Sequence, residues 1–158
     1  MNEFTAKKLG EVLAFAKVGN ETITKAMTVF SGMFSKDEID VFISKNNAHV
    51  DALTAYAKAQ NVSEIVMPKS EKTATKLIAM RDAYVGDEWD NPSEVFEWWG
   101  FFGGAALAHW NLVKGVGETL NDDILTALSY EAIGFHESLY NASSGLLSDI
   151  GREKAKNA

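Results

Sequence analysis

Apolar residues recur at three- and four-residue spacing through four long stretches of this chain, and no other feature constrains its fold as strongly. The stretches cover about 5–33, 35–60, 92–120 and 121–150, and their spacing is that of amphipathic helices. Apart from a short apolar run at 62–67, no segment has the two-residue alternation of a strand. The sequence therefore predicts an all-α protein.

Local signals mark where several of these helices begin. Ser35-Lys-Asp-Glu38 has the pattern of a capping box, in which the glutamate returns to a free backbone amide. Asn91-Pro-Ser-Glu94 combines a capping asparagine, a proline at the first helical position and an acid at the third. The link before Ser35 is so short that the first two helices are expected to form an antiparallel hairpin.

Four long amphipathic helices bury their apolar stripes most simply as an antiparallel four-helix bundle made of two helical hairpins. The connection at 61–91 is long enough to return along the bundle, which would make the second and third long helices, over 35–60 and 92–120, parallel. Pro68 interrupts this connection, so we expect it to carry one short helix over about 70–85. We expect a single domain over 1–150 and a flexible polar tail at 151–158.

Composition excludes several classes of protein. The chain has no cysteine, which excludes disulfides, thiolate metal sites and cysteine nucleophiles. Fifteen basic residues against 22 acidic ones give a net charge of −7, which argues against a nucleic-acid partner. Residues 1–5 lack a secretory signal pattern, and polar residues interrupt the most apolar stretch. We therefore expect a cytoplasmic protein without a membrane partner.

The three histidines of the chain lie on or beside apolar helix faces. His49 shares the inward stripe of its helix with Asn46, and His109 continues the apolar series of the helix over 92–120. His136 and Glu131 flank the stripe of the last helix on opposite sides. Counted from the predicted turns, all three histidines stand at similar heights near the middle of the bundle.

This convergence predicts a metal site in which His49, His109 and His136 supply nitrogen ligands. Glu131 or water would complete the coordination, and zinc or iron would suit such a site. Asn20 and Asn46 would hold a histidine tautomer or a buried water. The alternative interpretation is that the histidines and asparagines are ordinary core residues with hydrogen-bond partners.

The layout of the helices resembles that of the ferritin-like bundles, and less closely that of the DinB-like bundles. The resemblance implies a metal site between facing helices. The ferritin-like motif is Glu-x-x-His on two helices, whereas this chain has Asn46-x-x-His49 and a Glu131-x-x-x-x-His136 spacing. Glu131 and His136 lie about 140° apart around their helix. The DinB-like pattern has an inward histidine like His49, but of its last-helix pair only His136 is present.

The third long helix, over 92–120, carries five aromatic residues from Phe96 to Phe102, together with Trp110. These rings point all round the helix, so one stripe cannot bury them all. We expect Phe96, Trp98, Phe101 and Trp110 to form a homodimer interface. The alternatives are a cover formed by 61–91 and a pocket for an apolar or planar ligand.

The sequence contains no complete catalytic motif, and three functions stay open. The expected one is a non-catalytic bundle that acts by self-association or partner binding through its aromatic-rich helix. A metal-binding bundle with a histidine site is the first alternative. A carrier of an apolar small-molecule ligand is the second.

Overall fold

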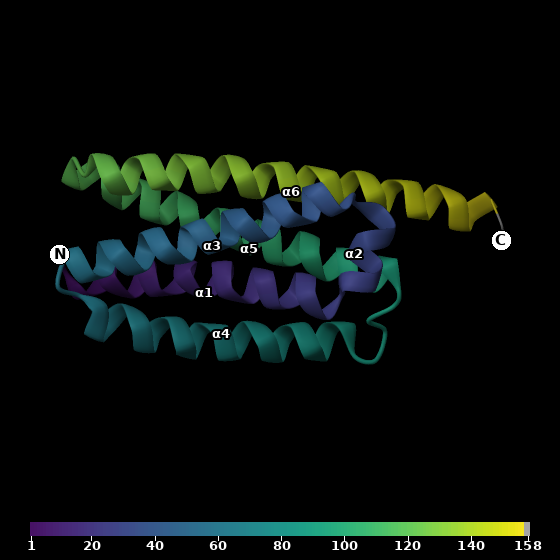
Figure 1. Cartoon of the computed structure of the whole chain (residues 1–158), viewed down its shortest axis with the longest axis horizontal. Helices are drawn as coiled ribbons and strands as arrows, with labels where there is room; N and C mark the ends of the chain where they lie inside the picture. The colour runs from purple at the N-terminus through teal and green to yellow at the C-terminus, as the bar shows by residue number, and fades with distance from the viewer. Residues whose placement is uncertain (157–158) are drawn as a thin grey trace.

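The computed structural model describes residues 1–156, and every regular element in that range is a helix. The helices are α1 (Glu3–Lys25), α2 (Met27–Met33), α3 (Lys36–Ala59), α4 (Ser63–Val85), α5 (Pro92–Leu120) and α6 (Asp123–Lys156). Figure 1 shows the long helices lying side by side, with successive ones running in opposite directions and α2 at one end. The predicted all-α class is confirmed.

The helix α1 lies at the centre of this arrangement. It packs against α3, α4 and α5, while α5 and α6 pack against each other along their length. One part of the core is rich in aromatic rings, among them Phe15, Phe30 and Trp99. The other part contains Leu9, Leu53 and Trp110. Both parts of the core therefore form between helices that are far apart in the sequence.

The predicted start signals are present. In the capping box, the Glu38 backbone N–H donates to Ser35 Oγ at 3.3 Å, and the Ser35 backbone N–H donates to Glu38 Oε2 at 2.8 Å. Asn91 caps α5 through the Ser93 backbone N–H at 3.1 Å, with Pro92 at the first helical position. These contacts satisfy amides that would otherwise lack partners at the helix ends.

The connection between the two hairpins differs from the expected short helix. α4 begins at Ser63 and runs through Pro68 to Val85, so it is a full-length member of the bundle. The exposed Pro68 removes one backbone hydrogen bond near the start of the helix. Packing on α1 outweighs this loss, because α4 buries a regular stripe there: Val66, Ser70, Leu77, Arg81 and Val85.

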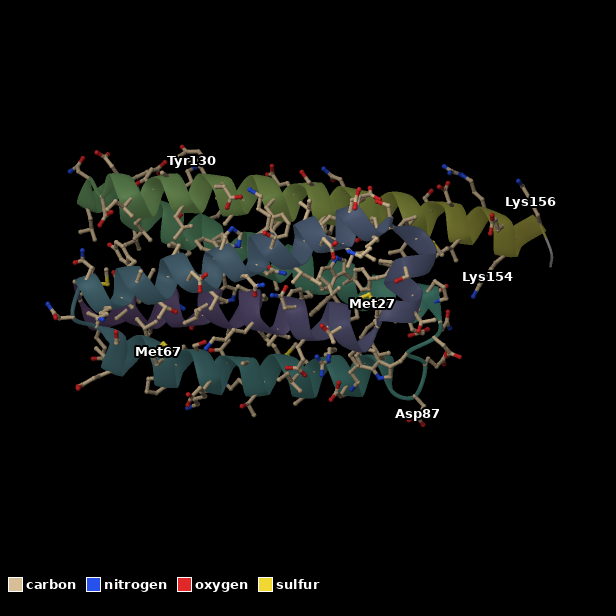
Figure 2. All side chains as sticks on the ribbon, viewed as in Figure 1. Met27, Met67, Asp87, Tyr130, Lys154 and Lys156 are labelled. Atoms are coloured by element: carbon tan, nitrogen blue, oxygen red, sulfur yellow. The ribbon has the colours of Figure 1, made fainter. Side chains whose placement is uncertain are left out.

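Two further boundaries differ from expectation. The first predicted helix is divided at Ala26 into α1 and α2. The last helix continues beyond Ile150 to Lys156, so the expected tail is helical as far as the structure describes it, and residues 157–158 lie outside the described residues. Lys154 and Lys156 project from this end of α6 (Figure 2), where their positive charges interact favourably with the negative end of the helix dipole.

None of the helices formed by residues 1–156 is both long enough and apolar enough to cross a membrane.

Gly10 provides a test of the contact between α1 and α4. A Cβ atom added at Gly10 would lie 2.6 Å from the Val66 carbonyl oxygen and 2.8 Å from Lys69 Cβ. We expect Gly10→Ala to lower the free energy of unfolding by about 1–3 kcal/mol, because backbone must move to make room. Urea denaturation measures this change.

Gly115→Ala is the matched control, since an added Cβ there meets nothing within 4 Å. Its helix propensity gain is expected to leave stability equal or raise it by up to about 1 kcal/mol. Equal stability of the two variants would contradict the close approach of α4 to α1.

Candidate functional site

His49 of α3 and Glu131 of α6 meet at the seam between their helices. His49 Nε2 lies 2.5 Å from Glu131 Oε2, and Lys45 Nζ donates to Glu131 Oε1 at 2.6 Å. Lys45 and His49 are one turn apart on α3, which places both on the side facing Glu131. The His49 ring is buried, whereas the other two side chains reach the surface. Protein donors thus hold both oxygens of the Glu131 carboxylate.

Glu131 is ionised in this arrangement. Partial burial would raise the pKa of Glu131, but the hydrogen bonds from Lys45 and His49 outweigh burial and lower the pKa overall. An ionised carboxylate can only accept hydrogen bonds, so His49 Nε2 carries the proton and donates. The Nδ1 atom on the other side of the His49 ring is buried and has no hydrogen-bond partner.

His136 lies directly behind this pair in the interior. Its ring centroid is 6.2 Å from that of His49, and the rings of Trp110 and Phe135 each lie 5.6 Å from His49. Burial and, to a smaller extent, the neighbouring His49 lower the pKa of His136 to about 3, although Glu131 partly opposes this shift. His136 is therefore neutral near pH 7, and its buried Nε2 has no hydrogen-bond partner.

His109 does not join this cluster. It lies on the α1 side of α5, where its Nδ1 is 3.0 Å from Glu11 Oε2 without the alignment of a hydrogen bond. Lys8 and Lys69 also pair with Glu11, each at 2.9 Å. Within residues 1–156, no group of three or more His, Asp or Glu side chains is placed to hold a metal ion. The expected set of three histidine ligands is thus not assembled, because α5 turns His109 away from the α3–α6 seam.

The two asparagines lie at the contact between α1 and α3. Asn20 Nδ2 donates to Asn47 Oδ1 at 2.8 Å and to the Ile43 carbonyl at 3.4 Å. Asn46 is buried against Gly19, where an added Cβ would lie 3.0 Å from Asn46 Nδ2. Asn20 therefore does not hydrogen-bond to a histidine, as the sequence predicts, but joins α1 to α3 through these hydrogen bonds.

The aromatic residues of α5 differ sharply in exposure. Phe96, Trp98 and Trp110 are buried within the chain, so these three expected interface residues are core residues. The ring centroids of Tyr84 on α4 and Trp98 are 6.1 Å apart. This contact agrees with the alternative prediction that residues 61–91 cover the aromatic helix. Phe101 is 60% exposed. The rings find separate burial sites because α1, α4 and α6 pack against different sides of α5.

Sequence reasoning missed Arg81, a buried cation on α4. Its Nε donates to Asp82 Oδ1 at 2.9 Å, and its terminal nitrogen pairs with Glu21 of α1 at 3.1 Å. Trp89 covers the guanidinium at 5.3 Å. The only signal in the sequence is the position of Arg81 one turn after Leu77 on an otherwise apolar stripe. We interpret Arg81 as a residue that joins α4 to α1.

Comparison of the chain with known protein families, with curated proteins and with solved structures gives no match. The fold and the site define an all-α helical-bundle protein with a charged, histidine-containing seam between α3 and α6.

The buried His136 should make stability depend on pH. Since the pKa of His136 in the folded protein is about 3, below the ordinary 6.5, the unfolded chain binds more protons between these values. Stability is therefore full above about pH 6.5 and falls as the pH decreases. We expect a loss of about 2 kcal/mol between pH 6.5 and 5.

His136→Gln should flatten this part of the profile, because the variant removes the group that takes up the proton. The variant leaves unchanged the other titratable groups of the seam, which are His49, Glu131 and Lys45. Urea denaturation at several pH values between 7 and 5 measures both slopes. Equal slopes in the two proteins would show that His136 does not stay neutral in the folded state.

Proposed function

We propose that the protein acts by self-association through a surface centred on Phe101 of α5. This surface contains a groove of about 680 Å³. The groove is lined by Tyr84, Glu97, Gly100, Phe101, Gly104, Ala105, Tyr140, Ser144 and Leu147. The observation that carries the proposal is the 60% exposure of the Phe101 ring beside this groove. Partly exposed aromatic anchors of this kind dominate the energy of many interfaces.

A second copy of the chain is the occupant that fits this surface best. Gly100 and Gly104 are one turn apart on α5, and a Cβ added to either meets nothing within 4 Å. A protruding ring therefore lies next to a strip without side chains. In a two-fold symmetric dimer, each Phe101 would enter the strip of the other copy, so the same patch supplies both the protrusion and the recess.

We also propose a ferritin-like antiparallel arrangement for four of the helices. α1, α3, α5 and α6 form a closed ring of contacts, and each neighbouring pair runs in opposite directions. α4 then serves as the long return between the hairpins and packs outside this unit on α1. This placement supports parallel α3 and α5, as the connection at 61–91 predicts.

Phe101→Asp should abolish self-association. We expect the native protein to have about twice its chain mass of 17.3 kDa in solution, and the variant to be monomeric. The dimer dissociation constant should rise at least about 30-fold, because a charge replaces a central anchor. Sedimentation equilibrium measures both masses.

Phe4→Asp is the matched control, because Phe4 is a similarly exposed phenylalanine on α1. It should leave the dimer intact. A native protein that stays near 17.3 kDa at high concentration would overturn the proposal. So would a dimer that both substitutions leave unchanged.

A metal-binding function through His49 and His136 is the second candidate. It is favoured by two adjacent rings from different helices whose buried His49 Nδ1 and His136 Nε2 atoms have no partner. Glu131 orients the His49 ring from its other side, as carboxylates often do for histidine ligands. Zinc and iron both accept imidazole ligands.

Zinc titration of the protein without a histidine tag tests this candidate. Binding should be lost in His136→Gln and kept in His109→Gln, since His109 lies with Glu11 instead. If the native protein takes up no zinc or iron, or if both variants behave alike, the candidate is wrong.

A further inference from the structure

A second groove, of about 440 Å³, lies between α3 and α6 beside the Lys45–Glu131 pair. Its lining residues on α6 extend from Glu131 to Ala142, which corresponds to about 16 Å along a helix. The groove exists because α3 packs mainly on α1 and α6 mainly on α5, so the two helices make few direct contacts. Gly134 adds to the opening, since a Cβ built there meets nothing within 4 Å.

The walls of this groove are apolar and aromatic. Phe34, Phe42 and Phe135 are half-buried, so each keeps part of its ring exposed there. Phe34 and Phe42 pack edge to face at 5.1 Å, and Leu139 lies in the core beneath. The volume is in the range of small-molecule sites, which are mostly apolar with a few placed polar groups. An apolar chain or ring of a ligand would therefore find burial here.

The charged end of the groove has unused hydrogen-bond donors. Glu131 accepts from Lys45 on one oxygen and from His49 on the other. The Lys45 ammonium has three N–H donors, and its contact with Glu131 uses one of them. His49 is buried and keeps the Glu131 carboxylate in place. The hydrogen-bond capacity left for a ligand at this end is thus that of the remaining Lys45 N–H donors, which suit an anionic group. The other carboxylate that lines the groove, Glu38, is about two helical turns from Lys45 along α3 and accepts hydrogen bonds from Ser35.

We propose that the groove between α3 and α6 binds a small amphipathic carboxylate. Its apolar part lies along Phe34, Phe42 and Phe135, and its carboxylate accepts hydrogen bonds from Lys45. A ligand with an ammonium group would be repelled by Lys45 and would meet a Glu131 carboxylate that already has two donors. This site is independent of the proposed dimer surface, which lies on the α4, α5 and α6 side around Phe101.

Calorimetric titration with decanoate and with decylammonium tests the proposal, because the two probes share one chain and differ in the charge of the head group. We expect saturable binding of one decanoate per chain, and about tenfold weaker binding of decylammonium. Lys45→Gln should remove most of this preference while leaving the apolar contacts.

Gly134→Leu should block the groove, because the new side chain enters the open space beside Phe135. Gly145→Leu is the matched control: it is also an exposed glycine of α6 with open space around its Cα, and it does not line the groove. We expect Gly134→Leu to weaken decanoate binding at least about tenfold and Gly145→Leu to leave it unchanged.

Each outcome of these titrations decides the proposal. Absence of decanoate binding at millimolar concentration would overturn it, as would equal binding by the Gly134→Leu and Gly145→Leu variants. Stronger binding of decylammonium would also overturn it, by showing that the site prefers cations. Phe101→Asp should bind decanoate like the native chain, so failure of the dimer proposal would not affect this result.

Discussion

The enclosure of α1 by three other helices is the constraint on which the bundle depends. Leu9, Leu13 and Val18 are almost completely buried, and α3, α4 and α5 are all needed to cover them. Burial of such side chains supplies the main favourable term in folding. Gly10 and Gly19 lie where residues of α4 and α3 approach the α1 backbone closely, so side chains at these positions would push the helices apart.

The central position of α1 also explains where charge is tolerated inside the molecule. Glu11 lies on this buried helix, and burial would raise its pKa, but hydrogen bonds from Lys69 and Lys8 outweigh burial and keep the pKa lowered. Arg81 enters the same interior from α4 and is paired with Glu21. Buried charges are stable only when such partners are present. The Lys69–Glu11 and Arg81–Glu21 pairs join α4 to α1, and Lys8 adds a second positive charge beside Glu11.

The seam between α3 and α6 has a different character, because neither helix depends on the other for most of its packing. Lys45, His49 and Glu131 join the two helices by hydrogen bonds and charge instead of close apolar contact. This leaves both the unpartnered interior nitrogens of His49 and His136 and the open groove lined by phenylalanines. The dense aromatic core around α5, by contrast, leaves only Phe101 of its clustered rings at the surface. The two proposed binding surfaces therefore arise from opposite causes, a deficit of packing at one and an excess of aromatic side chains at the other.

The sequence by itself determined the all-α class, the caps at Ser35 and Asn91, and the inward position of His49. These features follow from contacts within a few residues along one helix, which the periodicity of the chain records directly. Only the tertiary structure decided that α4 passes through Pro68, that His109 faces Glu11, and that Phe96, Trp98 and Trp110 are core residues. It also decided that Glu131, although on the edge of its helix stripe, reaches His49 and Lys45. These outcomes depend on how each helix is rotated against neighbours far away in the chain, and that rotation is fixed by packing between segments, not by the order of residues within one of them.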